Sequence, residues 1–167
     1  LYTADAGNDT YISVTNTTDK IKAVKVRMLE HKNSKEVLDF NLYLSPYDMW
    51  SAAITLDASG NPMIKTYDTS CTVGRVTTQG IAFRNSEYSA YSDKSLARAK
   101  IGHIELIEMG NVDPNQTLAT IGGKTWTAGE AIIHGADNKP GNCDAVSAAF
   151  RAGGAWAGAN QNVGVEP

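Results

Sequence analysis

Alternation of apolar and polar residues with a period of two runs through the first half of the chain. In residues 10–15, Ile12 and Val14 fall on one face, and Tyr11 and Ser13 fall on the other. A period of two is the pattern of a half-buried strand, because successive side chains of a strand point to opposite faces. The segment is therefore predicted to be a β-strand with one face in a core.

The same alternation recurs at short intervals along the chain, with polar, Pro-containing or Gly-containing turns between the segments. Further strands are predicted at residues 22–30, 36–44, 49–56, 63–67 and 100–109, and shorter ones within 72–83 and at 129–134. Several short strands separated by turn residues are typical of two packed antiparallel sheets. The predicted fold class is mainly β, an antiparallel immunoglobulin-like β-sandwich.

One short helix is predicted near the C-terminal end of the sequence. Asn142 can cap a helix over residues 143–151, because its side-chain oxygen can accept from the first free backbone N–H groups. Residues 152–167 are small, rich in Gly and Asn, and weakly charged, which indicates an extended arm or linker. We therefore expect a sandwich domain with its C-terminal helix in residues 1–151, followed by this arm.

The net charge and the lack of a long apolar stretch argue against two classes of partner, nucleic acids and membranes. The chain has 167 residues, the length of one domain, with a formal net charge of −3 and no cluster of Lys or Arg. Binding to nucleic acid through phosphate contacts is therefore not expected. No apolar stretch is long enough to span a membrane.

The two cysteines, Cys71 and Cys143, are predicted to form a disulfide, because neither has a His or Cys at a metal-ligand spacing. The alternative is two buried thiols, as in a cytosolic protein. The sequence begins at Leu1, so we expect a processed or trimmed chain whose upstream part held a signal peptide or the start of an expressed fragment. An extracellular or cell-surface location is predicted.

Catalytic motifs are absent from the sequence. There is neither a Gly-x-Ser-x-Gly elbow nor a His-Glu-x-x-His helix, and no phosphate loop or haem-attachment motif. His103 and Glu105 share one face of a predicted strand, where they could orient a base or offer two metal ligands. The alternative is a polar pair on an exposed sheet face. No catalytic, metal or cofactor-binding residue is predicted, and the protein is expected not to be an enzyme.

Aromatic residues in turns and Gly-rich segments are the candidate contact residues. Trp126, Trp156, Tyr47, Tyr88 and Tyr91 all lie in such segments or at outward positions. Exposed Trp and Tyr rings can anchor a protein partner or stack against the faces of a glycan. Both uses stay open, and the protein interface is favoured.

Several segments together resemble a group of uncharacterised, secreted or cell-surface proteins of Gram-negative bacteria. The resemblance lies in residues 11–18, 24–27, 36–41 and 44–50, and it extends to residues 102–110 and 142–156. It implies an extracellular β-rich protein that is a piece of something longer. These motifs are strand and turn patterns, so the resemblance assigns no site residue.

The function predicted from these observations is that of a non-enzymatic extracellular structural or adhesive surface protein, one able to self-assemble as a filament or envelope subunit. Its expected partner is a second copy or an adjoining surface protein, bound through an unpaired edge beside the strand at 10–15. The arm, with Trp156 and Val163 as anchors, is expected to cross the contact; the alternative is a monomer with a free tail. A glycan-binding module is the second hypothesis, and a hydrolase using His103 and Glu105 is the third.

Overall fold

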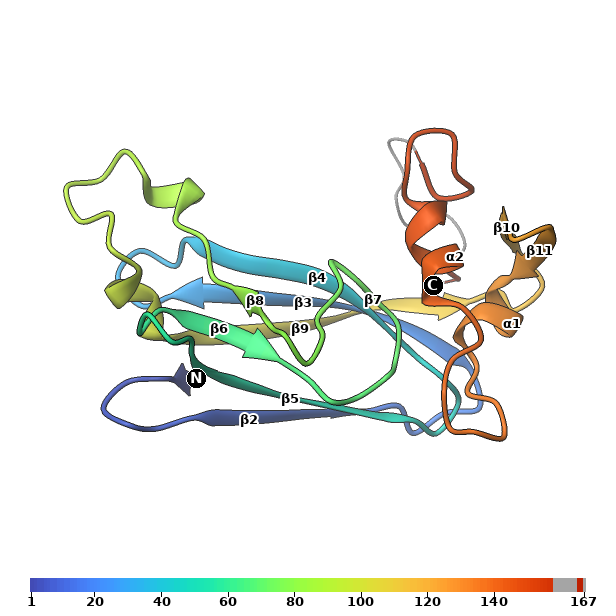
Figure 1. The fold of residues 1–167 in the computed structure, drawn as a ribbon, viewed down its shortest axis with the longest axis horizontal. Helices are drawn as coiled ribbons and strands as arrows, with labels where there is room; N and C mark the ends of the chain where they lie inside the picture. Colours follow the sequence, from blue (N-terminus) through green and yellow to red (C-terminus); the bar gives the residue numbers. More distant parts are fainter. Residues whose placement is uncertain (158–164, 167) are drawn as a thin grey trace.

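The computed structural model describes residues 1–157 and the backbone of residues 165–166, which form a large and a small antiparallel sheet and a separate two-stranded hairpin (Figure 1). The large sheet contains, in spatial order, β1 (Tyr2–Thr3), β9 (Ile101–Val112), β3 (Ile21–Glu30), β4 (Glu36–Leu44) and β7 (Thr72–Val73), and β12 (Val165–Glu166) also pairs with β9. The small sheet contains β2 (Thr10–Thr15), β5 (Met49–Leu56), β6 (Pro62–Lys65) and β8 (Ile81–Ala82). The predicted mainly β, antiparallel fold class is confirmed.

The main core lies between the two sheets, where the alternating apolar residues meet. Val26 and Phe40 of the large sheet and Trp50 and Ile54 of the small sheet are buried in one cluster. Phe40 and Trp50 lie with their ring centroids 5.7 Å apart. The period-two pattern of the sequence therefore determines which face of each sheet is inside. The immunoglobulin-like topology stays a prediction.

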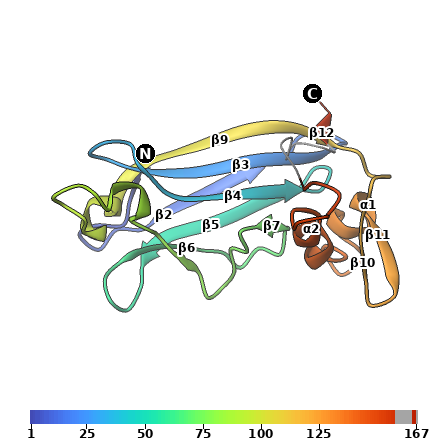
Figure 2. The same cartoon turned by 90° about the horizontal axis from the view of Figure 1, so that it is seen from above.

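A second core covers the opposite face of the large sheet at one end of the molecule (Figure 2). It is built by a hairpin and two helices: β10 (Thr117–Ile121), β11 (Lys124–Thr127), α1 (Ala128–Ile132) and α2 (Cys143–Ala149). Tyr43 belongs to this core, whereas its neighbours Leu42 and Leu44 belong to the main core. Both faces of β4 are thus buried at this end.

The disulfide between Cys71 and Cys143 is present, and it joins the second core to the edge of the large sheet. Cys71 directly precedes β7, and Cys143 is the first residue of α2. Asn142 caps α2 as predicted, since its side chain accepts hydrogen bonds from the backbone N–H groups of Asp144 and Ala145.

Two of the predicted elements were wrong. Residues 129–134 were expected to be a strand, but α1 covers Ala128–Ile132. Thr127 and Glu130 form a capping box at its start, and this reciprocal pair favours a helix. The described residues therefore contain two α-helices where one was expected. Residues 72–83 contain two short strands in different sheets instead of one.

The predicted arm begins inside the second core. Trp156 stacks on Tyr43 with a centroid distance of 5.5 Å, and its ring N–H donates to Oε1 of Gln116 at 2.9 Å. Burial of this large ring fixes the chain at residue 156, so the prediction of an extended arm or linker outside the core from residue 152 was wrong at its start. Residues 158–164, including the predicted anchor Val163, and residue 167 lie outside the described part of the chain.

Two short 3₁₀-helices lie at the end of the molecule away from α1 and α2 (Figure 1). They are η1 (Ser86–Tyr88) and η2 (Leu96–Lys100). Arg98 of η2 reaches into the protein and pairs with Glu30 at the end of β3. This contact holds the long segment between β8 and β9 against the sandwich.

Candidate functional site

The outer edge of β9 is paired only at its two ends among the described residues. β1 pairs antiparallel with Gly102 and Ile101, and β12 pairs antiparallel with Val112 and Asn111. Between them, residues 103–110 bond to β3 on one side and have no strand on the other within the described chain. A strand filling this gap antiparallel to β9 would run in the same direction as β1 and β12 and lie between them.

Side chains of β9 alternate between the inside of the sandwich and its outer face. Leu106 lies opposite Val26, and residues opposite each other on neighbouring strands share a face. Val26 belongs to the main core, so Leu106 also points between the two sheets, yet it is 44% exposed. Its neighbour Ile107 lies opposite Lys25 on the outer face and is 48% exposed.

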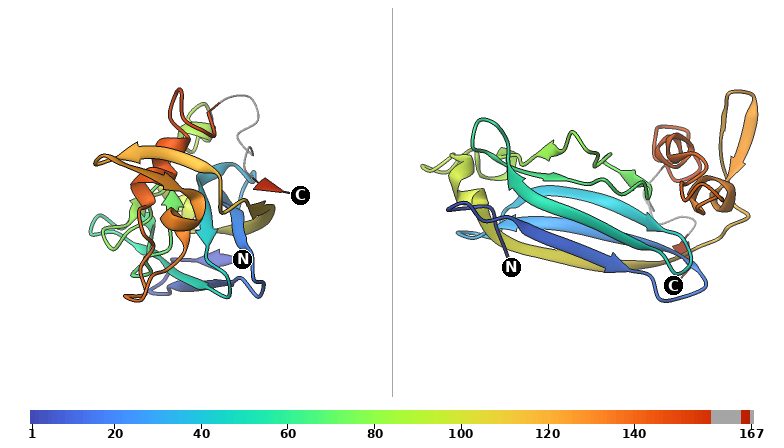
Figure 3. Two further views of the ribbon diagram at one scale, coloured as in Figure 1. Left: turned by 90° about the vertical axis from the view of Figure 1, so that its right-hand side faces the viewer. Right: turned by 60° about the horizontal axis from the view of Figure 1, so that its bottom comes forward.

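A groove of about 230 Å³ opens between the two sheets on this side of the molecule. Its apolar wall is formed by Val14 of β2, Val24 of β3, Leu44 of β4 and Leu106 of β9. The view at the right of Figure 3 shows β2 and β9 running along the same side of the sandwich. The groove therefore gives access from solvent to apolar side chains of the main core.

β2 also presents a free edge. It pairs with β5 along its whole length, from Thr10 opposite Ile54 to Thr15 opposite Met49. Within the part of the chain that the structure describes, no strand pairs with its other side. The sequence predicted a free edge beside this segment; it did not predict the longer one on β9.

Two acidic residues of β9, Glu108 in the groove and Glu105 on the outer face, are paired with cations of β3. Lys22 donates to Glu108 at 2.5 Å, and Arg27 donates to Glu105 at 2.8 Å. These pairs span neighbouring strands and leave the β9 edge without a net excess of negative charge at either position. Charged side chains often protect sheet edges from pairing with other chains. At these two positions of β9 the negative charges are balanced by the positive charges of β3.

His103 and Glu105 share the outer face of β9 as predicted, but the structure gives Glu105 another partner. The ring Nε2 of His103 lies 4.0 Å from Glu105, whereas the guanidinium of Arg27 bonds to that carboxylate directly. This arrangement is a cross-strand charged ladder. Among the described residues, no group of three His, Cys, Asp or Glu side chains is arranged to hold a metal ion.

The five aromatic candidates are not brought together. Trp156 and Tyr88 are buried, so the expectation that they face a partner was wrong. Trp126 is half-buried against the second core beneath the Lys124 ammonium, which lies 3.9 Å from the ring centroid. Tyr91 and Tyr47 are exposed, but Tyr91 lies by Arg98, at the end of the molecule away from Trp126.

Asp48 and His134 form a polar cluster that the sequence reasoning did not find. The Asp48 carboxylate lies 3.4 Å from Nδ1 of His134 and accepts from the Ser70 hydroxyl and the Ser45 backbone N–H. The Ser45 hydroxyl in turn bonds to the backbone of Ile132 and His134. These bonds tie the β4–β5 turn to the end of α1, which is a structural role.

Comparisons with protein-family models, with curated proteins and with solved structures find no match for this chain. No helix in the described residues has the length and apolar character needed to cross a bilayer.

Proposed function

We propose that the protein is a non-enzymatic, extracellular structural or adhesive protein whose copies assemble by adding a strand to the edge of β9. The observation that supports this most strongly is the gap at residues 103–110, flanked by β1 and β12. Strand addition supplies main-chain hydrogen bonds for affinity, and alternate side chains supply specificity. The groove beneath the gap accepts the inward side chains.

The chemistry of the gap defines the strand that it accepts. The position opposite Leu106 faces the groove and requires an apolar side chain, because Val24 and Leu44 line it. Positions opposite Glu105 and Ile107 face outward beside Arg27 and Lys25 and tolerate polar side chains. An alternating strand, like those of the small sheet, meets both requirements.

A second copy of this chain is the proposed donor. Two segments of this chain, β1 and β12, already pair with the same edge in the same direction. The chain also presents β2 as a strand with a free side among the described residues. Each copy thus offers both an acceptor edge and an alternating strand with Ile12 and Val14 on its inner face.

An extracellular setting is part of the proposal, and the disulfide supports it. Cys71 and Cys143 are bonded, and disulfides persist in oxidising compartments. Open sheet edges are hazardous in any protein that is to remain a monomer, since they pair with other chains. In an assembling surface protein the same edge is used productively.

Light scattering over a wide concentration range tests the proposal, with two neighbouring substitutions as a matched pair. Leu106→Lys places a charge in the apolar wall of the groove, whereas Ile107→Lys places it on the outer face at nearly equal exposure. Wild type and Ile107→Lys are expected to associate, and Leu106→Lys is expected to stay monomeric. Monomers in all three samples at every concentration would overturn the proposal.

A further inference from the structure

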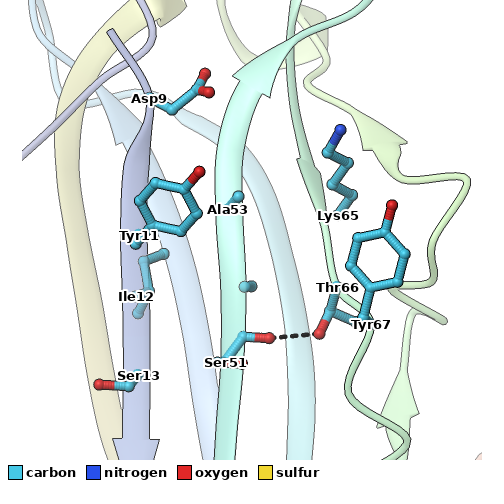
Figure 4. Close-up of a pocket in the computed structure, with 10 residues that line it drawn as sticks. Asp9, Tyr11, Ile12, Ser13, Ser51, Ala53, Lys65, Thr66 and Tyr67 are labelled. Carbon is cyan, nitrogen blue, oxygen red and sulfur yellow. Dashed lines mark hydrogen bonds between the residues drawn. The ribbon is translucent and has the colours of Figure 1, made fainter.

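The outer face of the small sheet carries a second groove, distinct from the one beside β9 (Figure 4). Its volume is about 450 Å³, within the range of small-ligand sites. Tyr11 of β2 and Tyr67, just after β6, stand on either side of β5, and they are 81% and 82% exposed. Two large rings left in water on one sheet face mark a binding surface rather than a packing surface.

The register of the strands explains why the groove forms there. Tyr11 lies opposite Ala53, and Ala53 lies opposite Lys65. A row across the sheet therefore has a small side chain on β5 between two large side chains. The next row has Ser13 opposite Ser51, again with a small residue on the central strand. The small side chains of β5 therefore form the bottom of the groove, and the larger side chains of Tyr11 and Lys65 form its sides.

Tyr67 is held in position by its buried neighbour. The Thr66 hydroxyl donates to the backbone carbonyl of Ser51 (Figure 4). It also accepts from the backbone N–H of Asp68. The Thr66 backbone N–H donates to Thr77. Bonds on both sides of Tyr67 fix the backbone at this point, so the ring is presented from a rigid support.

The rim of this groove carries a few polar groups, one of them negatively charged and one positively charged. Asp9 stands beside β2 and Lys65 beside the opposite wall, toward the same end of the groove (Figure 4). Together with the two phenol hydroxyls, they offer a carboxylate acceptor, an ammonium donor and groups that do both. Lysine and aspartate offset each other, so the groove has no excess charge to attract a polyanion.

We propose that this groove binds a neutral oligosaccharide. The positive C–H edges of a pyranose ring match the negative faces of Tyr11 and Tyr67, while its hydroxyls match Asp9 and Lys65. An added peptide strand does not fit, because the backbone of β5 is already bonded to β2 and β6. The ligand must therefore be recognised by side chains alone. This site goes beyond the proposed assembly. Both use β2, but Tyr11 lies on the outer face of the small sheet, whereas Val14 of the same strand lines the groove beside β9.

Native-gel affinity electrophoresis of the full chain tests the inference, with β-glucan, xylan, glucomannan, galactomannan, dextran and soluble starch as probes. Wild type is expected to be retarded by at least one of these polysaccharides. Tyr11→Ala and Tyr67→Ala should each weaken that binding by at least about tenfold, as loss of a stacked ring implies. Migration unaffected by every polysaccharide would overturn the inference.

Two controls separate this site from other effects. Tyr47→Ala removes an exposed tyrosine outside the groove and should leave the binding within about twofold of wild type. Leu106→Lys should also keep it, so failure of assembly and failure of glycan binding are distinguishable. Binding that survives the Tyr11→Ala/Tyr67→Ala double substitution would contradict the assignment of the site to these rings.

Discussion

Glu30 is the most completely satisfied buried charge among the described residues. Its carboxylate accepts from Arg98 through Nε at 3.0 Å and through Nη2 at 2.8 Å. It also accepts from the backbone N–H groups of Lys32, Asn33 and Lys35. Burial opposes ionisation of the carboxyl, but these donors prevail and lower its pKa to about 2.

Stability should therefore fall in acid as Glu30 takes up a proton. Its pKa is lower in the folded state than its ordinary value of 4.5, so its contribution is complete above about pH 4.5 and is lost as the pH falls toward 2. Urea unfolding at a series of pH values measures the slope. The Glu30→Gln variant should show a weaker dependence on pH in this window.

At neutral pH the same substitution should lower the free energy of unfolding by about 3–5 kcal/mol, because Arg98 would be left buried without its counter-ion. Glu87→Gln is the matched control, since Glu87 lies exposed in η1. It should change the unfolding midpoint very little. Equal effects of the two substitutions would contradict a structural role for the buried pair.

At the scale of elements, the disulfide connects β7 to α2 across 72 residues of sequence. Closing a loop of this length restricts the unfolded chain and stabilises the folded state by about 4 kcal/mol on the chain-entropy model. Urea unfolding of the oxidised protein and of the Cys71→Ala/Cys143→Ala variant should differ by about that amount. Unchanged midpoints would refute the role, as would two reactive thiols in the denatured, non-reduced wild type.

The longer strands of the large and the small sheet were predictable because each carries its own alternating pattern, whereas β10 and β11 were not predicted. Residues 10–15, 36–44 and 49–56 were placed from sequence with the bounds that β2, β4 and β5 have in the structure. Their local periodicity is sufficient, since the buried face of a strand is set by every second residue. The cap at Asn142 was equally local and equally predictable.

Elements fixed by distant contacts were not predictable in the same way. Trp156 lies in a Gly-rich segment typical of a free tail, yet Tyr43 and Gln116, far away in sequence, bury it. For α1 a local signal did exist, because Thr127 and Glu130 have the spacing of a capping box. A short apolar run was interpreted as a strand, and its β-branched residues at 132 and 133 favoured that error.

At the scale of the whole molecule, the candidate sites arise from the order of strands in the two sheets. Sequence placed Tyr11 on an outward face, but only the register brings it level with Ala53 and Lys65. The sequence predicted a free edge beside residues 10–15. The position of β9 in its sheet depends on pairing between strands far apart in sequence, which a local pattern cannot predict. The two grooves lie on different surfaces of the sandwich, although both are lined by residues of β2.

The central claim is that residues 103–110 accept a strand from a second copy, and amide hydrogen exchange measures this directly. In a dilute sample, the amides of this stretch that point away from β3 should exchange quickly, because within the described chain they have no strand to bond. In a concentrated sample they should become protected in wild type and in Ile107→Lys, and stay fast in Leu106→Lys. Equal exchange of these amides at all concentrations, in wild-type samples that light scattering shows to be associated, would contradict strand addition at β9.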